Sequence, residues 1–335
     1  MKYQTATLTQ QGGRAYNEDF CGSVELEDQL SYWVVADGLG GHGGGEVASQ
    51  LAVEAMLNAI AESPQMSTET LALQFNTAQA AVIEGQKSAF KLARMHTTAV
   101  GLIIHHDQAL WGHIGDSRLY YFHEGRLQSQ TQDHSVPQLL VKAGEIEASE
   151  IRFHEDRNRL LRSIGSQETF KPQLEKKPLQ LHSGDAFLLC SDGFWEYVFE
   201  DEMVSELTQA SSASQWLKSL ERRLLERVPE GNDNYTAIAI LVSEYEAYTT
   251  QFASITIAIK EFTVWLYNAV TKGTITTRNL ILAVPLVVCM RWICRRLRRV
   301  ESMLPQTRLP RPGVMSEAGN AMRGLLSLWY GRKPA

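Results

Sequence analysis

Residues 32–46 read YWVVADGLGGHGGGE: an apolar run reaches one carboxylate and then opens into a loop with six glycines. The run Tyr32–Ala36 combines aromatic and β-branched residues, a composition typical of a buried strand. Asp37 is therefore expected where a rigid strand ends and a permissive backbone begins. This arrangement suits a hard divalent cation, because the strand fixes the carboxylate and the glycines let backbone carbonyls come close.

The glycines of this stretch also allow other interpretations. Gly38, Gly40 and Gly43 match the G-x-G-x-x-G spacing of nucleotide-binding loops, although six glycines within eight positions satisfy many spacings by chance. No Gly-Lys-Ser/Thr sequence follows, so a P-loop is excluded. A flexible turn with one solvated aspartate explains this stretch as well as a metal site does. The rest of the chain has to decide between these interpretations.

Length and composition indicate one large domain with an appendage, because the chain has 335 residues, of which 44% are hydrophobic. Its four cysteines show no paired zinc-binding spacing and are too few for a disulfide framework, which favours a reducing compartment. The first residues, MKYQTATLTQ, lack an apolar segment. We therefore expect no signal peptide and a cytoplasmic location.

Charge divides the chain into two parts. Residues 247–335 contain 13 basic and 3 acidic residues, whereas residues 1–246 contain 19 basic and 35 acidic residues. We therefore expect an acidic folded domain over 1–246 and a basic extension over 247–335. The acidic domain argues against nucleic-acid binding.

Hydrophobic periodicity predicts strands and helices in blocks, the pattern of packed sheets flanked by helices. The polar residues 132–165 are expected to form a surface subdomain with short helical pieces. Trp33, Trp195 and the Cys190 thiol are expected in the core. Strands are expected at 3–10, 20–25, 31–36, 97–105, 109–114, 118–123, 185–190 and 235–242, and helices at 45–61, 67–92, 201–209 and 213–228.

Four aspartates stand beside the ends of predicted apolar strands, far apart in the sequence. Any one of them alone would be interpreted as the cap of a turn. If the strands lie side by side, however, the carboxylates meet, and their mutual repulsion raises their pKa values unless divalent cations bind. All-oxygen ligands favour Mg²⁺ or Mn²⁺ over zinc. The four are Asp37, Asp116, Asp192 and Asp233.

Two such ions would support phosphate-ester chemistry. Held roughly 3.5–4 Å apart, they can activate a water for in-line attack on phosphorus, without a covalent enzyme intermediate. Arg14, in a charged turn with Glu18 and Asp19, could hold the other phosphate oxygens as a bidentate fork.

With these residues, the chain resembles the metal-dependent serine/threonine protein phosphatases of type 2C, in their bacterial form. The resemblance covers residues 1–245 and implies an α+β fold, a central antiparallel β-sandwich flanked by helices on both sides, with the metals in a cleft at one end. The matching pieces are Arg14-x-x-Asn17-Glu18-Asp19, Val35-Ala36-Asp37-Gly38-Leu39-Gly40-Gly41-His42, Thr97-Thr98, Gly115-Asp116-Ser117-Arg118, Asp133-His134-Ser135, Ser191-Asp192-Gly193 and Asp233-Asn234-Tyr235-Thr236.

The resemblance also implies roles for single residues at a binuclear Mn²⁺ or Mg²⁺ centre. Arg14, Asp37 and Asp192 would be catalytic, with Arg14 binding the substrate phosphate. Residues 136–158 would form a mobile flap that selects substrates. The implied metal ligands are Asp37 between two ions, Glu18 and the Gly38 carbonyl on one, Asp192 and Asp233 on the other, and Asp116 with Asp192 on a third, weaker one; Asp19 and Asn234 would support these ligands.

Two positions depart from the family pattern. Many eukaryotic members have a histidine, proposed as the general acid, where this chain has Leu39; bacterial relatives usually have an apolar residue there. The leaving-group acid therefore stays open between a metal-bound water, His42 and His134, and a structural role is the simpler interpretation of either histidine. His96 stands where the family usually has glycine, and we expect it to be tolerated.

The extension contains an amphipathic pattern at 251–270, an apolar run at 280–290 with Pro285 inside it, and an arginine cluster at 295–299. A membrane span needs about 20 apolar residues, so this run is short. We expect residues 251–299 to lie on the inner membrane face or to bind a partner, with the arginines drawn to anionic lipid. A tail helix folded against the domain is a comparably good interpretation.

The leading functional hypothesis is a phosphatase that hydrolyses phosphoserine and phosphothreonine in proteins, namely those phosphorylated by a cognate serine/threonine kinase. One alternative is a catalytically impaired member that binds phosphoproteins or serves as a scaffold. Another, a nucleotide-binding enzyme, lacks the lysine and the ribose-binding context that its glycine-rich loop would need.

Overall fold

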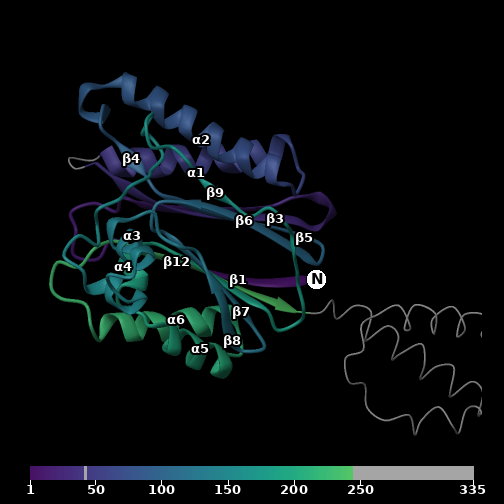
Figure 1. The fold of residues 1–335 in the computed structure, drawn as a ribbon. Helices are drawn as coiled ribbons and strands as arrows, with labels where there is room; N and C mark the ends of the chain where they lie inside the picture. The colour runs from purple at the N-terminus through teal and green to yellow at the C-terminus, as the bar shows by residue number, and fades with distance from the viewer. Residues whose placement is uncertain (41–43, 244–335) are drawn as a thin grey trace, which may run out of the picture. The chain divides into compact units, whose positions relative to one another are not determined.

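Two antiparallel sheets face each other at the centre of the molecule (Figure 1). The computed structural model describes residues 1–40 and 44–243. One sheet has the strand order β1 (Lys2–Gln10), β12 (Tyr235–Ser243), β11 (Ala186–Cys190), β7 (Arg118–His123), β8 (Arg126–Gln130). The other has the order β10 (Leu179–Gln180), β6 (Gln108–Ile114), β5 (Ala99–His105), β3 (Leu30–Leu39), β2 (Asp19–Glu25), with β4 (His96–Thr97) beside β3 and β9 (Gln173–Leu174) beside β6.

Strand β3 is covered on both faces, which explains why residues 32–36 are so apolar. Trp33 and Val35 face the other sheet and pack in the core between the sheets. Tyr32 and Val34 face the opposite way and pack under two helices. Because a strand that is covered on both faces has no solvated side, its residues do not alternate between apolar and polar.

Helices cover both outer faces of the sandwich (Figure 1). Their apolar sides pack on the outer faces of the two sheets and form a separate core cluster on each side. The expected α+β sandwich with flanking helices is therefore confirmed. The helices are α1 (Gly44–Glu62) and α2 (Thr68–Ser88) on the β3 side, and α5 (Glu200–Gln209) and α6 (Ala213–Leu225) on the β12 side, with the short α4 (Asp192–Trp195) after β11.

Helix α2 begins as expected but ends early. Ser67 caps its first turn by accepting a hydrogen bond from the Thr70 amide at 3.0 Å. The expected helix over 67–92 stops at Ser88, because Ala89 takes an extended conformation and a 3-10 turn, Phe90–Leu92, follows. This break turns the chain so that the Leu92 side chain returns to the core.

The strand that we expected over 97–105 is divided at Thr98, and β3 is longer than expected. Residues 30–35 of β3 pair with β5, whereas Gly38 and Leu39 pair with β4. Asp37 lies between these two pairings, where Thr98 donates its amide to the Asp37 carbonyl at 2.8 Å and accepts the Asp37 amide at 3.0 Å. Asp37 is thus held inside β3, and the prediction that it ends the strand is wrong.

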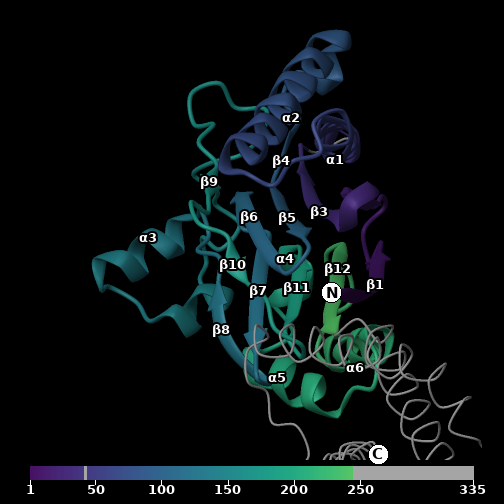
Figure 2. The ribbon, with the colours of Figure 1, turned by 90° about the vertical axis from the view of Figure 1, so that its right-hand side faces the viewer.

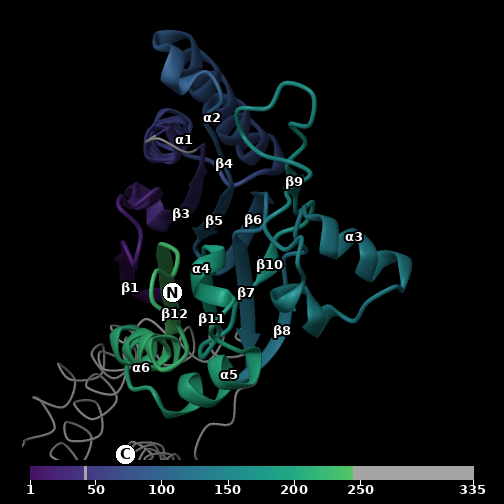
Figure 3. The same cartoon turned by 90° about the vertical axis from the view of Figure 1, so that its left-hand side faces the viewer.

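The surface subdomain is helical in short pieces, as expected. Helix α3 (Val136–Ala143) is capped by Ser135 and ends at Gly144, whose φ of 76° only glycine adopts without strain. A 3-10 helix over Ala148–Phe153 follows. Figures 2 and 3 show α3 standing to one side of the two sheets.

Within residues 1–40 and 44–243, no helix is both long and apolar enough to cross a membrane. The expectations for residues 251–299, and the loop residue His42, lie outside the described part of the chain.

Candidate metal centre

Strand pairing brings six acidic residues to one end of the sandwich. In one sheet, Arg118 and Cys190 are paired, as are Cys190 and Ala237, so the segments beside these residues lie at the same end. In the other sheet, Asp19 and Asp37 are direct cross-strand partners. We refer to Glu18, Asp19, Asp37, Asp116, Asp192 and Asp233 as the carboxylate cluster.

One hydrogen bond links the two sheets within the cluster. The Ser191 hydroxyl donates to the Asp19 carboxylate at 2.7 Å and also accepts the Thr236 amide at 3.0 Å. Burial and the neighbouring Asp192 and Asp233 raise the pKa of Asp19 to about 7, although the hydrogen bond from Ser191 opposes this rise. Asp19 thus supports the cluster from a buried position.

The centre of the cluster is the pair Asp37 and Asp192. Burial raises the pKa of Asp37 well above its usual range, and Asp192, Asp19 and Asp116 add to this rise. The pKa of Asp192 is raised as well, chiefly by burial, and Asp233 adds to this rise. Burial and Asp192 likewise raise the pKa of Asp116. Without a cation, these groups therefore do not all ionise together.

This donor set fits Mg²⁺ or Mn²⁺. Its side-chain ligands are all oxygen atoms, and a divalent cation would relieve the repulsion that raises these pKa values. Asp37, Asp192 and Asp233 are half-buried, so each keeps some access to solvent. Among the described residues, no three members of the carboxylate cluster have ligand atoms within 4.8 Å of one another, so the cluster is more open than a tight cage for one ion.

Glu18 and Gly38 meet at the first turn of α1. Burial raises the pKa of Glu18, and a hydrogen bond from the Gly45 backbone lowers it in part. The Glu18 carbonyl accepts the Gly38 amide at 3.0 Å and the Ser49 hydroxyl at 2.6 Å. A Cβ atom at Gly38 would lie 2.1 Å from the Gly45 carbonyl oxygen, so this contact requires glycine.

Asn234 ties the N-terminal loop to the start of β12. Its amide nitrogen donates to the Gln11 carbonyl at 2.6 Å and to the Tyr16 carbonyl at 2.9 Å. Its amide oxygen accepts the Glu18 backbone amide at 2.8 Å. These three bonds place Glu18 beside Asp233.

Arg14 lies at the solvent side of the cluster. Its guanidinium donates to the Asp233 carboxylate at 2.6 Å, and 54% of its side-chain surface is exposed. The geometry therefore leaves room for the guanidinium to turn towards a bound anion.

A buried ion pair behind Asp116 was not predicted from the sequence. Arg118 donates two hydrogen bonds, of 2.9 and 2.8 Å, to Asp133, and its guanidinium carbon lies 3.4 Å from the centre of the Trp195 ring. The Trp195 indole donates to the Asp116 carbonyl at 2.9 Å. Asp133 and Arg118 each belong to a matching motif, but the sequence between the two motifs does not indicate that these side chains pair.

Glu196 was also not predicted. Burial and the neighbouring Asp192 raise its pKa to about 7, while Arg157, bonded to it at 2.9 Å, opposes this rise. Glu196 follows Asp192 by four residues, which is one helical turn, and this spacing was a signal that could have identified it.

The described histidines near the cluster have structural contacts. His134 is buried and stacked on His113 with the ring centres 4.7 Å apart, and its Nδ1 accepts the Gly115 amide at 3.2 Å. Burial and His113 lower the pKa of His134 to about 3, so it is neutral at physiological pH. This geometry favours the structural interpretation of His134.

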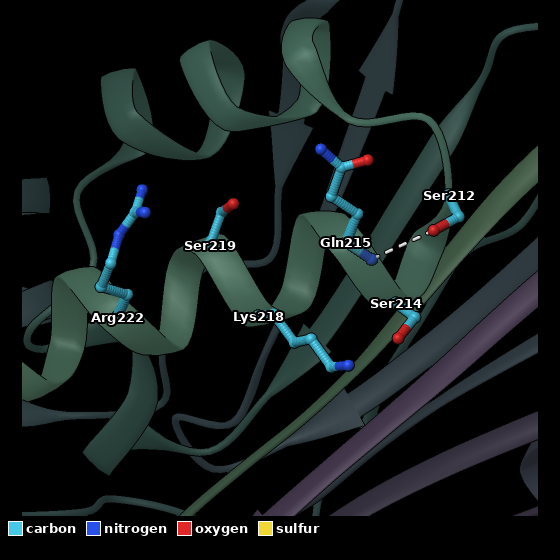
Figure 4. A pocket seen from close by; sticks show the side chains of 6 residues that line it. All are labelled: Ser212, Ser214, Gln215, Lys218, Ser219 and Arg222. Atoms are coloured by element: carbon cyan, nitrogen blue, oxygen red, sulfur yellow. Dashed lines mark hydrogen bonds between the residues drawn. The ribbon is translucent and has the colours of Figure 1, made fainter.

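Two of the hollows on the described surface differ in their relation to the predicted site. One, of about 310 Å³, is lined by Leu39, Arg94, His96 and Arg162 among others, so His96 lies in the wall of an open hollow. The other, of about 390 Å³, lies on the outer side of α6, where the side chains point in different directions and do not converge (Figure 4). The α6 hollow therefore suggests no site.

Comparisons with known proteins agree with this geometry. The model of the family described as Protein phosphatase 2C matches residues 10–230, which include every member of the carboxylate cluster except Asp233. The serine/threonine phosphatase stp of Listeria welshimeri is 33% identical over 207 residues, which are 60% of this chain and 81% of that protein.

Solved structures have a similar fold. The S. agalactiae serine/threonine phosphatase has a TM-score of 0.65 and 26% identity, over 72% of this chain and 100% of that chain. The catalytic domain of the serine/threonine protein phosphatase PstP, in complex with two manganese ions, has a TM-score of 0.63 and 27% identity, over 72% of this chain and 99% of that chain.

Proposed function

This chain belongs to the protein phosphatase 2C family of metal-dependent serine/threonine phosphatases, and we propose that it hydrolyses phosphoserine and phosphothreonine in proteins at a centre of two Mn²⁺ or Mg²⁺ ions. The observation that carries the proposal is the carboxylate cluster, whose members raise one another's pKa values where the two sheets meet. Such a cluster has no structural benefit to the fold unless cations occupy it.

The proposed ligands divide between the two ions according to their neighbours in the carboxylate cluster. Asp37 would hold both ions, because Asp192 is its acidic neighbour and the next residue, Gly38, donates its amide to the Glu18 carbonyl. Glu18 and the Gly38 carbonyl would bind one ion at the first turn of α1. Asp192 and Asp233 would bind the other, and Asp116 would share a third, weaker ion with Asp192. When bound, the ions supply an acidified water and offset the charge of the phosphate.

The residues of the chain then position the substrate. Arg14 would turn from Asp233 to the phosphate and hold two of its oxygens as a fork. Asp19, held by Ser191, and Asn234, which fixes Glu18, would keep the ligands in place. As the P–O ester bond breaks, the serine or threonine oxygen takes a proton and leaves as the free hydroxyl.

Hydrolysis of an aryl phosphate and of a phosphothreonine peptide tests this proposal. We expect Asp37→Asn and Asp192→Asn each to lower the Mn²⁺-dependent rate by at least about 100-fold. The matched control is Asp201→Asn at the exposed Asp201 in the first turn of α5, which should retain the wild-type rate. Turnover by the wild-type protein that persists in EDTA would contradict a metal-dependent mechanism.

The same experiment separates the alternative function. If the wild-type chain binds Mn²⁺ and a phosphopeptide but hydrolyses neither substrate, it is a phosphoprotein-binding member of the family. We further propose that its substrates are phosphorylated by a serine/threonine kinase of the same cell, and that residues 251–299 contact an anionic membrane surface or a partner. The kinase is inferred from the family, and the contact of residues 251–299 is inferred from their sequence.

A further inference from the structure

Two histidines and a buried aspartate meet at the end of the sandwich opposite the carboxylate cluster. His123 ends β7, and Asp185 immediately precedes β11. The other ends of these strands adjoin Asp116 and Asp192, respectively. At about 3.3 Å per residue, the two ends are roughly 15–20 Å apart. This group therefore belongs to no part of the proposed phosphatase site.

We propose that His123, His182 and Asp185 form a binding site for Zn²⁺ or a similar late first-row dication. We call this group the distal histidine site. Its three ligand atoms lie within 4.8 Å of one another. Imidazole and carboxylate together suit zinc, whereas the all-oxygen carboxylate cluster suits Mg²⁺ or Mn²⁺. The two sites thus differ in donor chemistry, and the proposal does not depend on the phosphatase activity.

Asp185 is the fixed ligand of this site. Its side chain is 1% exposed, and one carboxylate oxygen accepts the Tyr121 hydroxyl at 3.1 Å and the His182 backbone amide at 2.9 Å. The other oxygen accepts His123 Nδ1 at 2.6 Å. A surface aspartate without these bonds would move freely, whereas Asp185 holds one oxygen towards the imidazole.

The geometry needs only a small change to hold an ion. Ligand atoms of a tetrahedral zinc ion lie about 3.3 Å apart, given zinc–ligand distances of about 2.0–2.1 Å. The ion would replace the proton between His123 and Asp185, which is released to solvent, and these two ligand atoms would separate slightly. The His182 ring, exposed and edge-on to the His123 ring with centres 5.3 Å apart, would move inward. Water would complete the coordination.

A second histidine pair provides an internal comparison. His105 and His106 stack with ring centres 4.2 Å apart, and their nitrogens lie 3.4 and 3.6 Å from Asp28. Asp28 is 78% exposed, so no buried carboxylate fixes this group. The backbone places the pair at the same end of the molecule, because the Leu181 amide donates to the Asp107 carbonyl at 2.7 Å. We therefore assign zinc to the distal histidine site and use the other pair as a matched control.

Competition with a chromophoric zinc chelator tests the assignment, using the full chain with excess Mg²⁺ to fill the carboxylate cluster. We expect the double variant His123→Asn/His182→Asn to bind zinc about 10–100-fold more weakly than the wild type. His105→Asn/His106→Asn should match the wild type within about twofold. Zinc should also raise the melting temperature of the wild type and of this control, but not of the first variant.

Because His123 and His182 lie at or near the surface, the variant should fold, which its circular dichroism and its Mg²⁺-dependent activity would verify. Equal zinc affinity of the wild type and His123→Asn/His182→Asn would overturn the proposal. A comparable loss of zinc affinity in the control variant His105→Asn/His106→Asn would overturn it as well.

Discussion

At the scale of single residues, two carboxylates near the candidate metal centre have opposite surroundings. Asp133 forms a bidentate ion pair with Arg118, and both side chains are almost fully buried. Asp37 instead faces other acidic residues, which raise its pKa further. The Asp133 charge is therefore paired within the fold, whereas the acidic neighbours of Asp37 oppose its ionisation.

In the metal-free protein, substitution by asparagine should change the free energy of unfolding in opposite directions at these two aspartates. Asp37→Asn removes an acid whose ionisation is unfavourable, so we expect the free energy of unfolding in EDTA to rise by roughly 1–2 kcal/mol. Asp133→Asn leaves the Arg118 charge buried and unpaired, so we expect it to fall by roughly 3–5 kcal/mol. Urea unfolding measures both. Destabilisation by Asp37→Asn would show that its carboxylate supports the fold.

His134 should make the protein sensitive to acid. Its pKa in the folded protein is about 3, below the ordinary value of about 6.5. The unfolded chain therefore binds a proton that the folded chain does not, and stability is lost as the pH falls from about 6.5 towards 3. Between about pH 7.5 and about pH 5, this loss amounts to up to about 2 kcal/mol.

His134→Gln should make stability less dependent on pH over this range. Comparison with the wild type cancels the contributions of the carboxylates, which titrate in both proteins. His96→Gln, on the half-buried His96 of β4, is the matched control and should keep the wild-type slope. If His134→Gln also keeps that slope, the neutral stacked state of His134 is refuted.

At the scale of elements, the close contact between β3 and α1 shapes the site. Gly38 lies against the Gly45 and Glu18 carbonyls, so the strand and the first helical turn meet without an intervening side chain. The same residue pairs with Thr97 of β4. Hence β3 holds Asp37 between two partner strands, while α1 holds Glu18.

Gly38→Ala should disturb both elements. The added Cβ would lie 2.1 Å from the Gly45 carbonyl oxygen and 2.6 Å from the Glu18 carbonyl oxygen, which are backbone atoms that cannot rotate away. We expect a loss of about 2–3 kcal/mol in stability and weaker Mn²⁺ binding by calorimetry. Gly144→Ala is the matched control, because Gly144 has a φ of 76° but an added Cβ would meet no atom within 4 Å. It should lower stability by only about 1 kcal/mol and leave the Mn²⁺ affinity unchanged. Equal effects of both substitutions would argue against a role for the contact.

At the scale of the whole molecule, all the proposed site residues lie within the compact unit Met1–Glu244. The two sheets are linked by the Ser191–Asp19 hydrogen bond at the carboxylate cluster and, at the other end, by the Tyr3 hydroxyl, which donates to the His106 carbonyl at 2.6 Å. The carboxylate cluster and the distal histidine site thus lie at opposite ends of the sandwich, and all their residues belong to this unit.

A truncation to residues 1–246 tests the proposed domain division. We expect it to keep the kcat/KM of the full chain for an aryl phosphate within about twofold, because every proposed ligand remains. We expect only the full chain to sediment with vesicles that contain anionic lipid, since the arginines at 295–299 supply the attraction. Equal sedimentation of both proteins would contradict the membrane prediction, and an inactive truncation would contradict the boundary at 246.

The sequence alone predicted much of this fold because its information is local. The apolar run of β3, the Ser67 cap and the glycines around Asp37 each depend on neighbours a few residues away. The motifs also identified the carboxylates of the candidate site, since each one stands beside a recognisable turn. The predicted sandwich and the family are confirmed, whereas the ligand roles stay predictions.

Only the tertiary structure decided which distant residues meet. The exchange of β3 from β5 to β4 at Asp37, the Arg118–Asp133 pair and the meeting of His123 with His182 depend on strand register and on how loops return. The early end of α2 likewise follows from the need to bring Leu92 back to the core. Local spacing does not encode such contacts, because the packing of the two sheets, and not the residues between the partners, sets the distance between them.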